Sequence, residues 1–239
     1  MNVIKKIAII SACIPALSLG VIRIPGSHTV AIPFAEMPTA EAASMIGTTA
    51  ASESLEKATA YYKAKDYSKA YTLMKQAAEQ GNAIAQYNLG MMYEKGKGVE
   101  KDYVEAVKWY HKASEQGIAS AQYNLGVMYN EGNGVEKNYV EAVKWYRKAA
   151  AQGMVEAQYN LGVMYANGEG VAKNDVEAVK WFRKAAAQGM AEAQYNLGVM
   201  YENGKGVEKN YVEAVKWLRK AAVLGIAQAQ ELLKKMGYN

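Results

Sequence analysis

Tyr87-Asn88-Leu89-Gly90 is the stretch that decides the fold, because the same four residues return three more times at intervals of 36 positions. Other residue types follow the same period: tryptophan at 109, 145, 181 and 217, and glycine pairs at 96/98, 132/134, 168/170 and 204/206. A fixed period in this range is typical of a stacked array, in which each unit is too small to bury its own apolar side chains. The sequence therefore predicts a repeat protein rather than one or two ordinary globular domains.

Each unit reads as a helix, a glycine-rich loop and a second helix. Ala85, Leu89 and Tyr93 stand four residues apart, which places them on one face of the first helix. A second stripe with steps of three and four residues follows at Ala106, Trp109, Tyr110 and Ala113. A glycine inside a helix costs about 1 kcal/mol relative to alanine. The return of Gly90 in every unit therefore indicates a close helix contact with no room for a Cβ.

The loop carries the signals that end one helix and begin the next. Gly96 and Gly98 allow left-handed backbone, and we expect Val99 to fold back as an apolar plug. Asp102 is the predicted N-cap of the second helix, with Glu105 as the other half of a capping box. The device returns at Asn138/Glu141, Asn174/Glu177 and Asn210/Glu213, and helix stop signals follow at Gly117, Gly153, Gly189 and Gly225.

Together these motifs resemble the Sel-one-like repeat (SLR) family in its exported bacterial form, a relative of the tetratricopeptide repeat. The resemblance covers residues 83–225 four times, as 83–118, 119–154, 155–190 and 191–225. It implies an all-α fold in which short helix hairpins stack into a right-handed superhelix that serves as a scaffold for protein partners. Residues 51–82 lack the glycine-rich loop and resemble an ordinary tetratricopeptide hairpin. Residues 226–239 are the predicted capping helix, which makes eleven helices.

The first 50 residues predict export. Lys5 and Lys6 precede an apolar run at residues 7–22, which is short for a membrane span of about 20 residues, so residues 1–24 look like a secretory signal. Residues 25–50 read as a disordered linker, and several cleavage points are open. Cys13, the only cysteine, follows a lipobox-like sequence, although the apolar run continues past it, which favours a small apolar residue within that run as the alternative. We expect a periplasmic or extracellular protein that meets a membrane only through its leader or a lipid on Cys13.

The sequence offers no catalytic, metal or cofactor site. His28 lies in the leader region, and His111 occupies a slot that holds Arg147, Arg183 and Arg219 in the later units, which indicates an exposed basic position. The chain lacks a cysteine–histidine cluster, a nucleophile elbow and a phosphate loop. The formal net charge of +5 would fall to +2 if the leader were cleaved after Ala35, and such a small balance does not argue for nucleic acid, which usually needs a clustered basic face, so we expect no nucleic acid partner.

We expect a monomer without cofactor that binds a protein or peptide. By resemblance to tetratricopeptide repeats, the first helices line a concave groove. The predicted groove residues form a ladder of tyrosines and asparagines: Tyr87, Asn88, Tyr123, Asn124, Tyr159, Asn160, Tyr195 and Asn196. Tyrosine gives contact area at low entropic cost, and asparagine pairs with a peptide backbone. Packing of the tyrosines between neighbouring helices, with local asparagine hydrogen bonds, is the alternative for the same residues.

Two other functions stay open at this point. A lipid on Cys13 would favour a lipid-anchored envelope-assembly factor. The resemblance also includes a cysteine-rich branch linked to β-lactam binding or hydrolysis, but no repeat of this chain contains cysteine. We therefore expect no enzyme activity.

Overall fold

The computed structural model describes residues 49–238, which form eleven α-helices and no strand. Residues 1–48 and 239 lie outside the described part, and so do the predicted signal peptide, Cys13, His28 and almost all of the predicted linker. The helices are α2 (Thr49–Lys63), α3 (Tyr67–Glu79), α4 (Ala83–Lys95), α5 (Tyr103–Glu115), α6 (Ala119–Glu131), α7 (Tyr139–Ala151), α8 (Val155–Asn167), α9 (Asp175–Ala187), α10 (Ala191–Asn203), α11 (Tyr211–Val223) and α12 (Ala227–Lys235). The predicted all-α repeat array and its eleven helices are confirmed.

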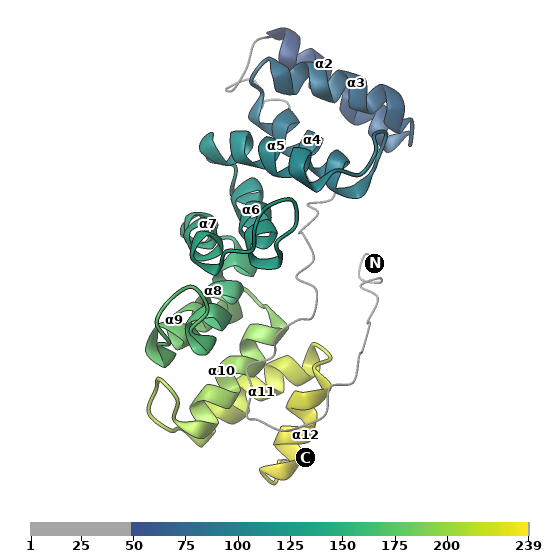
Figure 1. Cartoon of the computed structure of the whole chain (residues 1–239). Helices are drawn as coiled ribbons and strands as arrows, with labels where there is room; N and C mark the ends of the chain where they lie inside the picture. Colours follow the sequence, from purple (N-terminus) through teal and green to yellow (C-terminus); the bar gives the residue numbers. More distant parts are fainter. Residues whose placement is uncertain (1–48, 239) are drawn as a thin grey trace.

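The helices follow one another along an elongated array from α2 at one end to α12 at the other (Figure 1), and each packs on the next in chain order. We call α4, α6, α8, α10 and α12 the first-helix layer and α5, α7, α9 and α11 the second-helix layer. The first helices are buried nearly all round in their N-terminal ten residues, whereas the second helices bury a single stripe. None of the helices between residues 49 and 235 has both the length and the apolar character to cross a bilayer.

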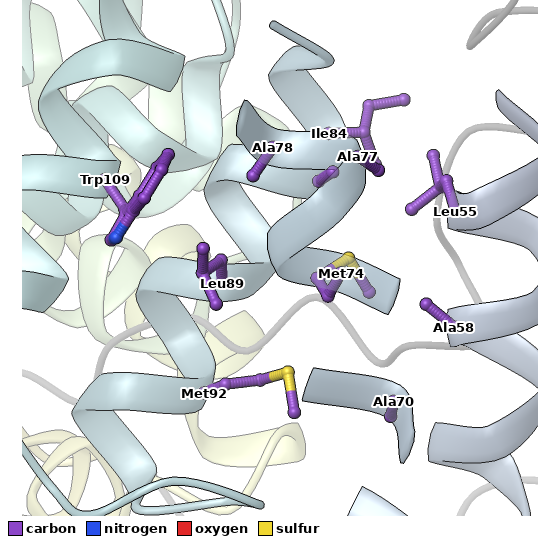
Figure 2. Packing of buried hydrophobic residues seen from close by; sticks show 11 residues of the cluster. Leu55, Ala58, Ala70, Met74, Ala77, Ala78, Ile84, Leu89, Met92 and Trp109 are labelled. Atoms are coloured by element: carbon purple, nitrogen blue, oxygen red, sulfur yellow. The ribbon is translucent and has the colours of Figure 1, made fainter. Parts of the chain in front are cut away.

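The hydrophobic core is divided into clusters that each join neighbouring repeats. Figure 2 shows the first cluster, where Leu55 of α2 and Met74 of α3 face Leu89 of α4. Trp109 of α5 closes the same cluster from the following hairpin. The next two clusters are closed in the same way by Trp145 and Trp181. Because each tryptophan packs into the core of the preceding repeat, no repeat completes its core alone.

The glycine of the recurring tetrapeptide has the role that its position predicts. A Cβ on Gly90 would lie 2.7 Å from ring carbons of Tyr110 on the facing helix α5. The same conflict returns at Gly126 with Tyr146 and at Gly162 with Phe182, each at 2.6 Å. Real Cβ atoms do not approach other carbons so closely, so the missing side chain lets the two helices of each hairpin pack ring against backbone.

The predicted N-cap is confirmed, but its partner differs from the expected capping box. The Asp102 carboxylate accepts hydrogen bonds from the backbone amides of Val104 and Glu105 at 2.8 and 3.1 Å. The Asp102 amide donates to the Tyr93 carbonyl at 3.0 Å, and the Glu105 carboxylate accepts from Lys108 at 2.6 Å. The Asp102 amide is therefore bonded to the preceding helix. The Glu105 carboxylate, which a capping box would use for that amide, pairs with Lys108 one turn along the helix instead.

Candidate functional site

The tyrosines of the predicted ladder lie mostly in the core. Tyr87, Tyr123 and Tyr159 are 4%, 3% and 2% exposed. Their rings meet the rings of the second helices, with centroid distances of 5.9 Å for Tyr87 with Tyr110 and 5.6 Å for Tyr123 with Tyr146. This burial corrects the expectation that the three residues present an exposed ladder to a partner. In the free chain the three tyrosines instead pack between neighbouring helices, which is the alternative that the sequence left open.

The asparagines of the ladder connect successive repeats. Asn88, Asn124 and Asn196 are buried. The Asn196 amide nitrogen donates to the hydroxyl of Tyr159 in the preceding repeat at 3.5 Å. Asn160 interacts in the same way with the hydroxyl of Tyr123. Tyrosine and asparagine thus form a polar contact between neighbouring first helices, and only Asn160 and Tyr195 keep partly exposed side chains.

Glutamates lie close enough to these tyrosines to raise the pKa of their hydroxyl groups. Burial raises the pKa of Tyr123 well above its ordinary value, and the nearby negative charge of Glu156 raises it further. Burial followed by Glu192 has the same effect on the pKa of Tyr159, and Glu202 lies near Tyr195. The sequences of α6, α8 and α10 contain no lysine or arginine. The central part of the first-helix layer is therefore acidic at its surface.

The second-helix layer carries the cations. Each of α7, α9 and α11 contains two lysines and an arginine, and Lys144 pairs with Glu141 at 3.1 Å. Lys148 stacks over the Trp145 ring at 4.1 Å, an arrangement that returns on α9 and α11. All salt bridges between described residues lie on α3, its N-cap or the second helices. Exposed pairs of this kind stabilise a fold by about 1 kcal/mol or less. Because each of α7, α9 and α11 carries three cations and at most two carboxylates, the surface of these helices is basic.

His111 has the surface position that the sequence predicts. Its Nδ1 lies 3.2 Å from a carboxylate oxygen of Glu115, and its ring packs edge-on against Trp145 with centroids 5.4 Å apart. Within residues 49–238, no three histidine, cysteine or acidic side chains are grouped to hold a metal ion.

A repeated hydrogen-bond network of glutamine side chains at the helix ends, which we call the glutamine device, was not predicted from the sequence. The Gln116 side-chain amide donates to the Gly81 carbonyl at 3.0 Å and to Gln86 Oε1 at 2.7 Å. Gln86 in turn donates to the Ala78 carbonyl at 3.2 Å. The arrangement returns for Gln152 with Gln122 and for Gln188 with Gln158. The repeated Gln-Gly dipeptide is a signal that could have revealed this network. A glutamine before the glycine that ends a helix, however, is indistinguishable in sequence from an ordinary surface residue.

Comparison with known proteins places these features in one family. The sequence model of the Sel1 repeat matches residues 60–82, 83–118, 119–154, 155–190 and 191–225. No curated protein matches the chain. The first segment, expected to be an ordinary tetratricopeptide hairpin, is thus also recognised as a Sel1 repeat.

Two solved structures share the fold at substantial identity. A protective antigen of uropathogenic Escherichia coli with an SLR fold is 43% identical with a TM-score of 0.76, over 78% of this chain and 41% of the antigen. A Sel1 repeat protein from Oxalobacter formigenes is 43% identical with a TM-score of 0.71, over 75% of this chain and 74% of that protein. The chain thus spans less than half the length of the antigen. Its repeats, the packing of its helices and its similarity to these two structures show that the chain belongs to the Sel1 repeat family.

Proposed function

We propose that this chain is an exported scaffold that binds a protein partner along the first-helix layer, and that the partner presents a basic segment there. Sel1 repeat proteins are generally protein-interaction scaffolds, and the fold is typically non-enzymatic. Repeat arrays suit this role because they extend a regular surface without requiring a single catalytic pocket. The concave shape of the binding face is part of the proposal.

The observation that carries the proposal is the separation of charge between the two layers. Glu156 and Glu192 stand one repeat apart near the tyrosine hydroxyls, and neither has a salt-bridge partner among the described residues. The first-turn glutamates of the second helices are instead paired with lysines of the same helix. A carboxylate without an internal cation is available to a lysine or arginine of a partner, which would also speed the encounter.

Half-buried Asn160 and Tyr195 are the members of the ladder that a partner can reach on this layer. The neighbouring helix ends differ between repeats, with Glu94-Lys95, Asn130-Glu131, Ala166-Asn167 and Glu202-Asn203 at corresponding positions. A regular core with a variable rim is suited to recognising an extended segment position by position.

Site-specific photo-crosslinking in the native envelope tests the proposal. A crosslinker at Asn160 or Tyr195 is expected to capture one and the same protein, whereas a crosslinker at Lys180 on the second-helix layer captures it poorly. With that protein purified, the double variant Glu156→Gln, Glu192→Gln should weaken binding about tenfold at low salt, and Glu177→Gln should not. Capture from Lys180 alone would mean that the partner binds the second-helix layer, and the proposal would be wrong.

Export is tested separately by cell fractionation and by the intact mass of the protein. The exported form should lack at least the first 20 residues, since a signal peptide of this kind is removed. A soluble intracellular form that begins at Met1 would refute the export proposal without affecting the scaffold proposal.

A further inference from the structure

The glutamine device that closes three repeats is interrupted in the last one. Leu224 stands 36 residues after Gln188, at the C-cap of α11, where Gln116, Gln152 and Gln188 stand in the earlier repeats. Its backbone angles, φ −84° and ψ 5°, match those of Gln188, φ −86° and ψ 5°. The chain therefore holds a leucine in a backbone position built for glutamine.

The interruption leaves a buried acceptor without its donor. Gln194 is 4% exposed and still donates to the Ala186 carbonyl at 3.2 Å. Its Oε1 has no hydrogen-bond partner, although the corresponding oxygens of Gln122 and Gln158 each accept from a glutamine amide at 2.9 Å. The carbonyl of Gly189, the counterpart of Gly117 and Gly153, lacks the same donor. A buried acceptor without a partner destabilises the fold, and a ligand that supplies the donor removes that cost.

A pocket of about 370 Å³ opens at this place between the start of α10 and the end of α11. It is lined by Gln194, Arg219, Lys220, Val223 and Leu224. Val223 and Leu224 are 87% and 55% exposed, whereas the earlier repeats carry Glu-Gln or Ala-Gln at these two positions. Two exposed apolar side chains and two cations thus lie at the surface beside a buried acceptor that has no donor.

We propose that this pocket binds an extended partner segment in which a glutamine side chain is flanked by apolar and acidic residues. The intact repeats show that a primary amide fits between the glycine carbonyl and the glutamine Oε1, at 2.9 Å from each in the case of Gln152. The partner's amide takes that place once the surface side chain of Leu224 rotates aside. Its apolar residues cover Val223 and Leu224, and its carboxylates meet Arg219 and Lys220. Gln194 is the one lining residue from the first-helix layer, and the others belong to α11 and its C-cap, so the pocket is a second binding site beyond the proposed function.

Fluorescence anisotropy with a labelled peptide of sequence Glu-Leu-Gln-Leu-Glu tests the proposal on the full chain. The peptide should bind, and replacing its glutamine by methionine, which has a similar length and no N–H, should weaken binding about tenfold. Exchanging its glutamates for lysines should weaken binding further. Failure of the parent peptide to bind at about 1 mM, or equal binding of the methionine peptide, would overturn the proposal.

Three protein variants complete the test. Leu224→Gln should lose at least tenfold in affinity while melting no lower than the parent chain, because its own amide then fills the site. Gln188→Leu creates the same vacancy one repeat earlier and should raise the stoichiometry from one peptide to two. Glu156→Gln should bind the peptide unchanged, because Glu156 lies on α8 and does not line this pocket, which separates the pocket from the acidic surface of the proposed function. Unchanged affinity in Leu224→Gln, or unchanged stoichiometry in Gln188→Leu, would refute the assignment.

Discussion

Replacing Gly134 by alanine should destabilise the array far more than the same change at Gly117. Both glycines have positive φ, +70° and +89°, where an alanine costs about 1–2 kcal/mol. They differ in their surroundings. A Cβ on Gly134 would lie 2.3 Å from the Tyr103 carbonyl oxygen and 2.8 Å from the Val104 nitrogen of the preceding repeat, whereas a Cβ on Gly117 meets nothing within 4 Å.

A Cβ at position 134 would clash with backbone atoms of Tyr103 and Val104, so the clash cannot be relieved by a side-chain rotation. Overpacking of this kind costs about 1–3 kcal/mol in addition to the conformational term. We therefore expect a loss of about 1–2 kcal/mol for Gly117→Ala and about 2–5 kcal/mol for Gly134→Ala. The difference between the two variants isolates the contact between repeats from the intrinsic preference of glycine.

Urea denaturation followed by far-ultraviolet circular dichroism measures both variants. Gly153→Ala is a second control, because this glycine also has positive φ and open space around its missing Cβ. Equal losses at Gly134 and Gly117 would mean that the loop does not dock tightly on the preceding repeat, and the reasoning would be wrong. A broadened transition for Gly134→Ala alone would indicate that neighbouring repeats unfold less cooperatively.

Three further predictions concern the core, the glutamine device and the buried tyrosines. Leu125→Ala, in a fully buried position of a central repeat, should cost about 2–5 kcal/mol in chemical denaturation, and Leu233→Ala in the terminal helix should cost less; equal costs would contradict the layered core. Gln152→Leu should lower stability by about 1–3 kcal/mol in the same assay, because two hydrogen bonds disappear and a buried acceptor stays unpaired; an unchanged midpoint would argue against the device. Burial raises the pKa of Tyr123 and Tyr159 in the folded chain, so the stability that these two tyrosines contribute should be constant below about pH 10 and fall above it as the unfolded tyrosines ionise. Urea midpoints between pH 8 and 11 should show a smaller fall for Tyr123→Phe, and an identical fall would exclude this tyrosine as a cause.

Much of the fold could be predicted from the sequence because its signals are local and repeated. The 36-residue period predicts the array, and the apolar stripe through Leu89 predicts the first helix. Asp102 marks the start of the second helix through a side chain that reaches only its own first turn. Gly90 even predicts a close helix contact, since a costly residue that returns in every unit requires a steric reason.

The candidate site was harder to predict because exposure depends on the neighbouring repeats. Tyr123 has the same local sequence whether it faces a partner or packs on Tyr146, and only the stacking of α6 on α7 decides between them. Asn160 and Tyr195 share the motif with their buried counterparts, yet they keep partial exposure. Helical periodicity tells which residues share a face, but it does not tell which face the next repeat covers.

The sequence by itself determined the helical class, the repeat length, the loop glycines and the N-caps of the second helices, since these follow from interactions within a few residues. The tertiary structure decided which side chains are buried and how charge divides between the two layers. It also decided that Gly134 packs against the backbone of the preceding repeat. The tertiary structure also shows why Leu224 matters. A leucine before a glycine is unremarkable in sequence, but the fold sets it beside Gln194, thirty residues away, whose acceptor needs the donor that leucine lacks.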